Sequence, residues 1–320
     1  MPRLWPLALA ALLLPALQAS AQSSGDNARE WLQRVSTAAN TLDYDGIFVY
    51  HSGDWMETMR LIHRTGPKGT QARLIALSGA AREVIRDDNQ VTCILPDTDS
   101  VLVSKSLHPA VAAFSVFSPN GDFSGHYKLQ AAPGNRVAGR ETEMVSIMPK
   151  DQFRYGYRLS VDRKSGFLLK SELLDHNGKV LEKIVYTSLE LPKTIPDSLL
   201  KPGISGAGYS WYVSEAPTKS AGGSSWAVEW VPEGFEMADS STDPAGFGRM
   251  PVEHLVYNDG LTSVSVFIEK LKPGNKPLDG LSSMGAVNAF GFMIDGYQVT
   301  AVGEVPGVTV ERVGRSVHRR

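Results

Sequence analysis

The residue types that carry catalysis are few in this 320-residue chain, and their spacing matches no complete catalytic motif. Its seven histidines are scattered, and none belongs to an H-E-x-x-H zinc pattern. Ser198 and Lys201 match S-x-x-K, but the S-D-N and K-T-G partners of a serine acyl enzyme are absent from the sequence. Gly-rich phosphate loops and a G-x-S-x-G elbow are absent too. The sequence therefore predicts a protein that is not an enzyme and carries no metal or other cofactor.

The remaining reactive groups have simple structural interpretations. Cys93 is the only cysteine, which excludes an intramolecular disulfide and a cysteine zinc cluster. It lies in the apolar run Val91–Leu95, so we expect a packed strand residue rather than a reactive thiol. Carboxylate pairs such as Glu141/Glu143 are expected on solvated faces, because acid–base catalysis needs shifted pKa values that sequence cannot reveal.

Arginines recur along the segments that look like strands. They are Arg60, Arg64, Arg73, Arg82, Arg86, Arg154 and Arg158. A cationic surface for lipid phosphates or an acidic partner is one interpretation, since guanidinium groups pair bidentately with such oxygens. The other, which we favour, is the polar side of an alternating sheet.

Aromatic residues raise a similar question. Phe48, Tyr50, Tyr155, Tyr157 and Phe167 are expected on the concave side of a curved sheet. If that side is open, the rings line a lipid-sized groove. If helices fill it, the rings are core, which general burial frequencies favour.

Periodicity predicts the elements that would position these residues. Apolar residues at helical spacing from Trp31 to Leu42 predict a helix, which Asn27 could cap. Three long β-rich segments follow one another farther along the chain: 154–161, 167–174 and 179–189. The first alternates with period two, which indicates one dry and one wet face. We therefore predict a large curved antiparallel sheet, a half-barrel.

The second half of the chain changes character. Residues 203–225 are rich in Gly, Ser and Pro, which predicts an interdomain linker. After Trp226, Asn258-Asp259-Gly260 between two β-rich runs predicts a hairpin. The glycine-rich segment 283–292 is expected to be helical, as is a terminal segment carrying Val310, Val313 and Val317. The predicted class is α+β, with a half-barrel domain at 22–202 and a small α+β domain at 226–320.

The N-terminus predicts export. Arg3 precedes the uncharged apolar run Leu7–Leu17, and Ala19-Ser20-Ala21 offers small residues to a signal peptidase. The run is about half the ~20 residues that span a bilayer. Residues 1–21 are thus predicted to be a cleaved signal peptide. The formal net charge of −2 gives no general attraction to nucleic acid.

Several strings resemble one protein family. Five segments are similar to segments of the MucB/RseB family, in the same order. They are Leu42–Tyr50 (LDYDGIFVY), Met56–Arg64 (METMRLIHR), Arg136–Arg140 (RVAGR), Asp151–Leu159 (DQFRYGYRL) and Gln298–Pro306 (QVTAVGEVP). Together they span nearly all of the chain after the signal peptide. The family's larger domain resembles lipoprotein-carrier half-barrels, which agrees with the predicted sheet.

The resemblance implies a periplasmic negative regulator of a sigma-E type envelope-stress response. Such a protein binds the periplasmic region of a membrane-spanning anti-sigma factor and shields it from a site-1 protease, and lipid or lipopolysaccharide fragments release it. Arg60, Arg64, Trp226 and Trp230 are our candidate partner contacts. The five aromatic residues named above are our candidates for the lipid groove. Homo-oligomers are compatible with the sequence.

Two other functions remain open. A periplasmic lipid or lipoprotein carrier would use the half-barrel as its cargo site, and an envelope hydrolase would need catalytic residues that no motif reveals. A pulldown from envelope extract distinguishes them, because one transmembrane regulator supports the first function and many lipoproteins support the carrier.

We predict that signal peptidase cleaves after Ala21. N-terminal sequencing of periplasmic protein should start at Gln22, or within one or two residues of it. Membrane-bound protein that retains Met1 would contradict the export hypothesis.

Overall fold

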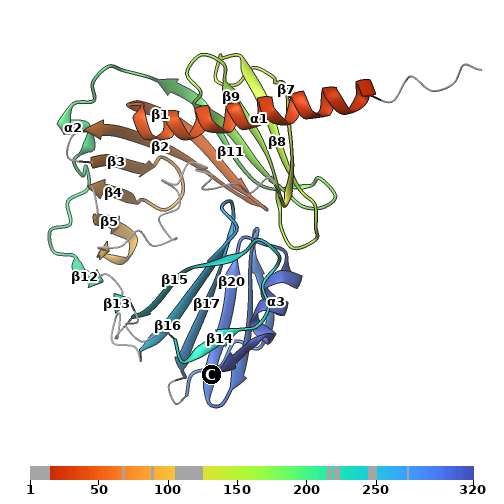
Figure 1. Ribbon diagram of the computed structural model, residues 1–320. Helices are drawn as coiled ribbons and strands as arrows, with labels where there is room; N and C mark the ends of the chain where they lie inside the picture. Colours follow the sequence, from red (N-terminus) through yellow and green to blue (C-terminus); the bar gives the residue numbers. More distant parts are fainter. Residues whose placement is uncertain are drawn as a thin grey trace, which may run out of the picture.

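The computed structural model describes residues 15–66, 69–87, 90–104, 125–214, 218–219, 224–243, 251–271 and 274–320. Figure 1 shows two sheets, an N-terminal one above and a C-terminal one below. The upper sheet is large and curved, and the lower one is smaller and flanked by a helix. The predicted class, a curved antiparallel half-barrel followed by a smaller α+β domain, is confirmed.

The larger sheet contains 12 strands within the described residues. Their spatial order is β12 (Ser210–Ser214), β6 (Ser100–Ser104), β5 (Gln90–Leu95), β4 (Glu83–Asp87), β3 (Gly69–Ala76), β2 (Trp55–Gly66), β1 (Tyr44–Ser52), β11 (Val180–Glu190), β10 (Leu168–Leu174), β9 (Gly156–Asp162), β8 (Thr142–Pro149) and β7 (Tyr127–Pro133). A short 3-10 helix, η1 (Pro96–Thr98), precedes β6. The predicted meander is confirmed, since β9, β10 and β11 pair antiparallel in succession.

One side of this sheet, the inner face, faces the first helix. Residues directly opposite each other on paired strands share a face of the sheet. The inner face is defined by one such line of cross-strand neighbours: Tyr50, Ile184, Ser171, Leu159, Val145 and Ala131. Helix α1 (Pro15–Thr41) packs Ala28, Leu32 and Val35 against Val145, Leu159 and their neighbours. The predicted helix is confirmed, but Asn27 lies inside α1 and does not begin it.

The opposite, outer face is covered by the chain that follows β11. Helix α2 (Asp197–Leu200) and Ile195 pack on Ile62. Ile204 and Tyr209 then pack on the cluster around Val101. The chain next forms β12, which pairs parallel with β6. The segment predicted as a linker therefore contains an edge strand of the N-terminal sheet, and its residues 215–217 and 220–223 lie outside the described residues.

The smaller sheet contains seven strands within the described residues. Their order is β13 (Thr218–Lys219), β15 (Glu236–Asp243), β16 (Val252–Asn258), β17 (Ser263–Lys270), β20 (Tyr297–Gly303), β19 (Val287–Ile294) and β18 (Gly280–Met284). Helix α3 (Gly307–Arg315) packs on β19 and β20, and β14 (Trp226–Val228) pairs with β21 (Val317–Arg319). The predicted Asn258-Asp259-Gly260 hairpin is confirmed by the pairing of β16 with β17.

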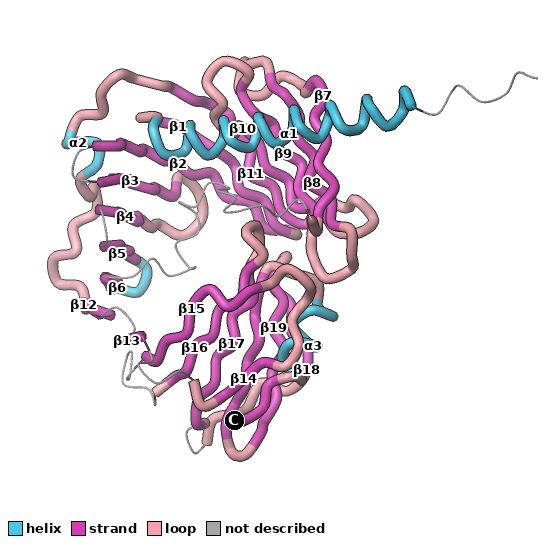
Figure 2. The backbone as a smooth tube through the Cα atoms, in the orientation of Figure 1, coloured by secondary structure: helices cyan, strands magenta, loops and turns pink. Residues whose placement is uncertain are grey.

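Two helix predictions in this domain need correction. Residues 283–292 form parts of the hairpin β18–β19, drawn as strand in Figure 2, and not a helix. Gly285 turns the chain with a φ of 61°, and β19 is held by its pairing with β20. Val310 and Val313 do lie buried on α3, but Val317 belongs to β21 because the helix ends at Arg315. Strand pairing in the folded protein decides the secondary structure of this glycine-rich segment, and its local sequence does not.

Candidate functional site

The five aromatic residues proposed for a groove divide between the core, the rim of the inner face and the domain junction. Phe48 and Phe167 are 4% and 1% exposed and lie in one apolar cluster. Their rings contact Tyr186 at centroid distances of 5.3 and 5.1 Å. These two rings fill the inner face instead of lining an open surface.

Tyr50 lies nearer the rim of the inner face. It is half-buried, and its ring meets Trp55 edge-on at 5.7 Å. Burial, and next the carboxylate of Glu182, raise the pKa of Tyr50 to about 12. Trp55 and Met56 are 51% and 65% exposed, so the β1–β2 turn presents apolar surface to solvent.

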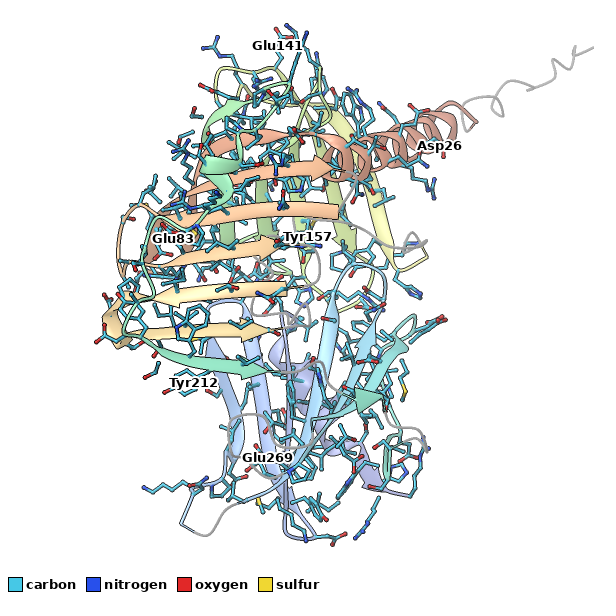
Figure 3. All side chains as sticks on the ribbon, turned by 90° about the vertical axis from the view of Figure 1, so that its left-hand side faces the viewer. Asp26, Glu83, Glu141, Tyr157, Tyr212 and Glu269 are labelled. Atoms are coloured by element: carbon cyan, nitrogen blue, oxygen red, sulfur yellow. The ribbon has the colours of Figure 1, made fainter. Side chains whose placement is uncertain are left out.

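Tyr155 and Tyr157 reach the C-terminal domain. The Tyr155 hydroxyl accepts a hydrogen bond from Asn288 Nδ2 at 3.1 Å. The Tyr157 hydroxyl donates to Glu304 Oε2 at 3.2 Å (Figure 3 labels Tyr157). Burial, and then Glu304, raise the pKa of Tyr157 well above its ordinary value. Both tyrosines therefore help to join the two domains.

The centre of this junction is a buried ion pair. Arg154 has no exposed surface, and its Nε donates to Asp259 Oδ2 at 2.6 Å. The Tyr127 hydroxyl donates to the same oxygen at 2.8 Å. The Arg154 guanidinium also contacts the Asp151 carboxylate and the Glu233 carbonyl oxygen.

The other oxygen of Asp259 orders its own turn. Asp259 Oδ1 accepts the amides of Leu261 and Thr262 at 3.0 and 2.9 Å. One carboxylate thus shapes the β16–β17 turn and neutralises an arginine from the other domain. The Asn258-Asp259-Gly260 pattern predicts Asp259 only as a turn residue, and that local signal by itself does not reveal a second role.

The candidate contacts Arg60 and Arg64 lie on β2, on the outer face. Arg60 is bidentate to Asp45, at 2.8 and 2.6 Å, and Arg64 Nη1 is 2.6 Å from Asp197 Oδ1. Arg73 and Arg82 likewise pair with Glu83 and Glu57 at 2.7 and 2.5 Å. These arginines already have acidic partners within the protein, which lowers the net positive charge of the sheet.

Trp226 and Trp230 occupy different environments. Trp226 is 1% exposed and lies in the core of the C-terminal domain. Trp230 is half-buried between Arg312, whose guanidinium carbon is 3.9 Å from the ring centroid, and Phe153 at 5.1 Å. The structure therefore does not bring the four candidate contacts into one surface patch.

One exposed apolar strip was not foreseen. Trp211, Tyr212 and Val213 of β12 are 59%, 45% and 56% exposed, on the edge of the larger sheet (Figure 3 labels Tyr212). The sequence signal was the short β-rich run Trp211–Val213, which the surrounding glycines obscured. Exposed apolar side chains on a sheet edge are a common feature of surfaces that bind other chains.

Metal and membrane signals are missing from the described part of the chain. There, no group of three His, Cys, Asp or Glu side chains is arranged to hold a metal ion. None of the helices described between residues 15 and 320 has both the length and the apolar character that a bilayer crossing requires.

The fold and the junction define a two-domain β-sheet protein. The aromatic inner face of its larger sheet lies next to a polar domain boundary, which hydrogen bonds and a buried ion pair cross. The chain belongs to the MucB/RseB family. The family model for the MucB/RseB N-terminal domain matches residues 27–204, and that for the C-terminal domain matches residues 220–318.

Individual relatives cover both domains. The chain is 33% identical to the sigma factor AlgU regulatory protein MucB of Pseudomonas aeruginosa, over 96% of this chain and 95% of the relative. It is 25% identical to the sigma-E factor regulatory protein RseB of Escherichia coli, over 99% and 98%. Its fold is similar to that of MucB in the Pseudomonas aeruginosa MucA/MucB complex, with 30% identity, a TM-score of 0.71 and coverage of 92% and 99%. It is also similar to MucB in complex with MucA(peri), with 29% identity, a TM-score of 0.70 and the same coverage.

Removing the charge of Asp259 should destabilise the protein. We expect Asp259→Asn to lower the free energy of unfolding by about 3–5 kcal/mol, because Arg154 then loses its fully buried counter-charge and keeps only the partly exposed carboxylate of Asp151. Chemical denaturation measures the change. The exposed Asp279→Asn in the same domain is the control and should stay within about 0.5 kcal/mol of the wild type. Equal stability of the two variants would contradict the role assigned to the pair.

Proposed function

We propose that this protein is a periplasmic regulator that binds the periplasmic region of a membrane-spanning anti-sigma factor and shields it from site-1 proteolysis. The observation that carries the proposal is the match of both domains to MucB in complex with MucA(peri), at 92% coverage of this chain. The names of its relatives, which are sigma factor regulatory proteins, support the same conclusion. We infer a binding role without catalysis.

Shielding follows from how proteases work. A protease needs an accessible, extended chain, and a segment that folds onto another protein loses that accessibility. The described surface offers apolar side chains for such binding at the β1–β2 turn and on β12. Arg60 and Arg64 remain proposed contacts, since their side chains keep 34% and 25% exposure despite their ion pairs.

Binding and protection are measurable together. The protein starting at Gln22 should bind a labelled peptide of the source bacterium's anti-sigma periplasmic region, and site-1 cleavage should slow in proportion to the bound fraction. Arg64→Ala should weaken binding if the outer face contributes, and Arg29→Ala, which removes another ion-paired arginine, is the matched control. A peptide that does not bind would refute the proposal. A carrier would instead retain lipid or many lipoproteins from envelope extract.

We further propose that lipid or lipopolysaccharide releases the anti-sigma factor. The half-exposed Trp55 ring, which contacts Tyr50 at the rim, supports this, because it places an exposed apolar group beside an apolar inner face. Each methylene buried there would contribute about 0.8 kcal/mol. An amphiphile that prefers one arrangement of the protein must alter the affinity for the peptide.

Lipopolysaccharide fragments below their aggregation threshold should weaken peptide binding by about 5- to 150-fold. The coupling is reciprocal, so saturating peptide should weaken fragment binding by the same factor. Trp55→Ala should reduce fragment binding while leaving stability close to wild type, because Trp55 is half exposed. Unchanged peptide affinity with fragment demonstrably bound would remove the release mechanism and leave the shielding function intact.

A further inference from the structure

Three cations gather around one carboxylate on the outer face of the larger sheet. They are Arg158 of β9, Lys170 of β10 and Lys183 of β11, which we call the cationic cluster. Their side-chain nitrogens lie 3.4, 2.7 and 3.4 Å from carboxylate oxygens of Glu172, also on β10. Glu172 stands directly opposite Arg158 and Lys183 on the paired strands. All four side chains share the outer face because each alternates along its strand with an inner-face residue.

Solvent meets the cations of this cluster and barely reaches its carboxylate. The side chains of Arg158, Lys170 and Lys183 are 42%, 27% and 37% exposed, whereas that of Glu172 is 6% exposed. Burial raises the pKa of Glu172, but hydrogen bonds and charges from Lys170 and then Lys183 outweigh it and hold the pKa below its ordinary value. Glu172 is therefore ionised at neutral pH. Three cations and one anion leave the cluster with a surplus of two positive charges.

The neighbouring part of the described outer face has a different charge balance. Arg60 pairs with Asp45 there, and Arg73 pairs with Glu83. Each of these arginines meets its own carboxylate, so the charges cancel. The chain that follows β11 also packs over part of that region. The surplus of positive charge lies instead at β9, β10 and β11, where the cationic side chains remain exposed.

The position of the cluster within the sheet favours phosphate groups over a peptide strand as its partner. β9, β10 and β11 are interior strands, whose backbone groups already pair with neighbouring strands on both sides. A peptide that extends a sheet needs an unpaired edge, which interior strands do not offer. Phosphate oxygens need only cations that donate hydrogen bonds, and guanidinium and ammonium groups supply them.

Apolar side chains lie beside the cations on the same face. Val185 stands directly opposite Lys170, and Val49 stands opposite Val185 on the next strand. Both valines are half-buried, so part of each remains accessible. Cations next to accessible apolar groups match the boundary between the phosphates and the acyl chains of a bilayer.

We propose that the cationic cluster docks this protein on the surface of an anionic phospholipid bilayer. Headgroup phosphates accept hydrogen bonds from Arg158 and the two lysines, and the neighbouring valines rest against the headgroup layer. This docking surface extends beyond the proposed function and does not rest on it, because neither the anti-sigma segment nor the rim at Trp55 takes part.

Sedimentation with sucrose-loaded vesicles tests the docking surface. The protein starting at Gln22 is mixed with vesicles of equal parts phosphatidylglycerol and phosphatidylcholine, or with vesicles of phosphatidylcholine alone. It should bind the anionic vesicles about 25-fold more tightly, because each of two surplus cations contributes about fivefold near such a surface. Added sodium chloride should reduce this preference, since salt screens exposed charges.

A matched pair of variants assigns the effect to the cluster. Arg158→Gln/Lys183→Gln removes the surplus and leaves Lys170, the nearest cation, beside Glu172. This variant should lose the preference for anionic vesicles, and circular dichroism should show that it is folded. Arg136→Gln/Lys276→Gln removes two exposed cations outside the cluster and changes the net charge equally. It should keep the wild-type preference.

Several outcomes would overturn the proposal. Wild-type protein without a preference for anionic vesicles is one, and an Arg158→Gln/Lys183→Gln variant that keeps the preference is another. Binding of polyglutamate but not of anionic vesicles would assign the cluster to an acidic protein partner. Release by sodium phosphate, but not by sodium chloride of equal ionic strength, would indicate a single-phosphate site. Lipid that leaves the vesicles with unsedimented protein would indicate a carrier.

Discussion

A guanidinium group with no access to water must be neutralised by the residues around it, and in this protein that requirement determines how the two domains meet. Arg154 belongs to the N-terminal domain, whereas its counter-ion Asp259 belongs to a turn of the C-terminal domain. Breaking such a pair leaves a buried charge, which is far more costly than losing an exposed one. The domain arrangement therefore depends on both residues, and Tyr127, the Asp151 carboxylate and the Glu233 carbonyl complete their coordination.

The polar contacts around that pair differ in how they respond to conditions. Asn288 with Tyr155, and Thr309 with the Phe153 carbonyl, are neutral hydrogen bonds. Burial, and then the charge of Glu182, raise the pKa of Glu304 to about 7, so this carboxyl group at the junction changes charge near neutral pH.

The larger sheet explains why aromatic residues alone did not reveal a binding site. Its inner face buries Phe48 and Phe167 in one apolar cluster with Tyr44 and Tyr186, and it directs Tyr155 and Tyr157 to the second domain. Tyr50 and Trp55 remain near the rim with exposed surface close by. Aromatic residues of the same alternating pattern thus lie in the core, at the domain junction or near the surface. Their environment depends on which part of the protein packs against that end of the strand.

Sequence alone determined the local features whose signals are periodic. The meander from β9 to β11, the amphipathic face of α1 and the β16–β17 hairpin follow from period-two and helical spacing and from turn residues. The family was identified from strings distributed along the chain. Glycine-rich segments misled the prediction at 283–292, because glycine permits a hairpin turn and gives no periodic signal.

Only the tertiary structure decided which distant residues meet. Arg154 and Asp259 are 105 positions apart, and nothing local in either segment indicates the other. The same holds for Glu182, near the start of β11, and Glu304, just after β20, whose charges act on each other across the domain boundary. Local sequence sets backbone propensity and the polar or apolar character of each face. The burial and electrostatics of a site depend on the groups that the fold brings around it, and those come from the whole chain.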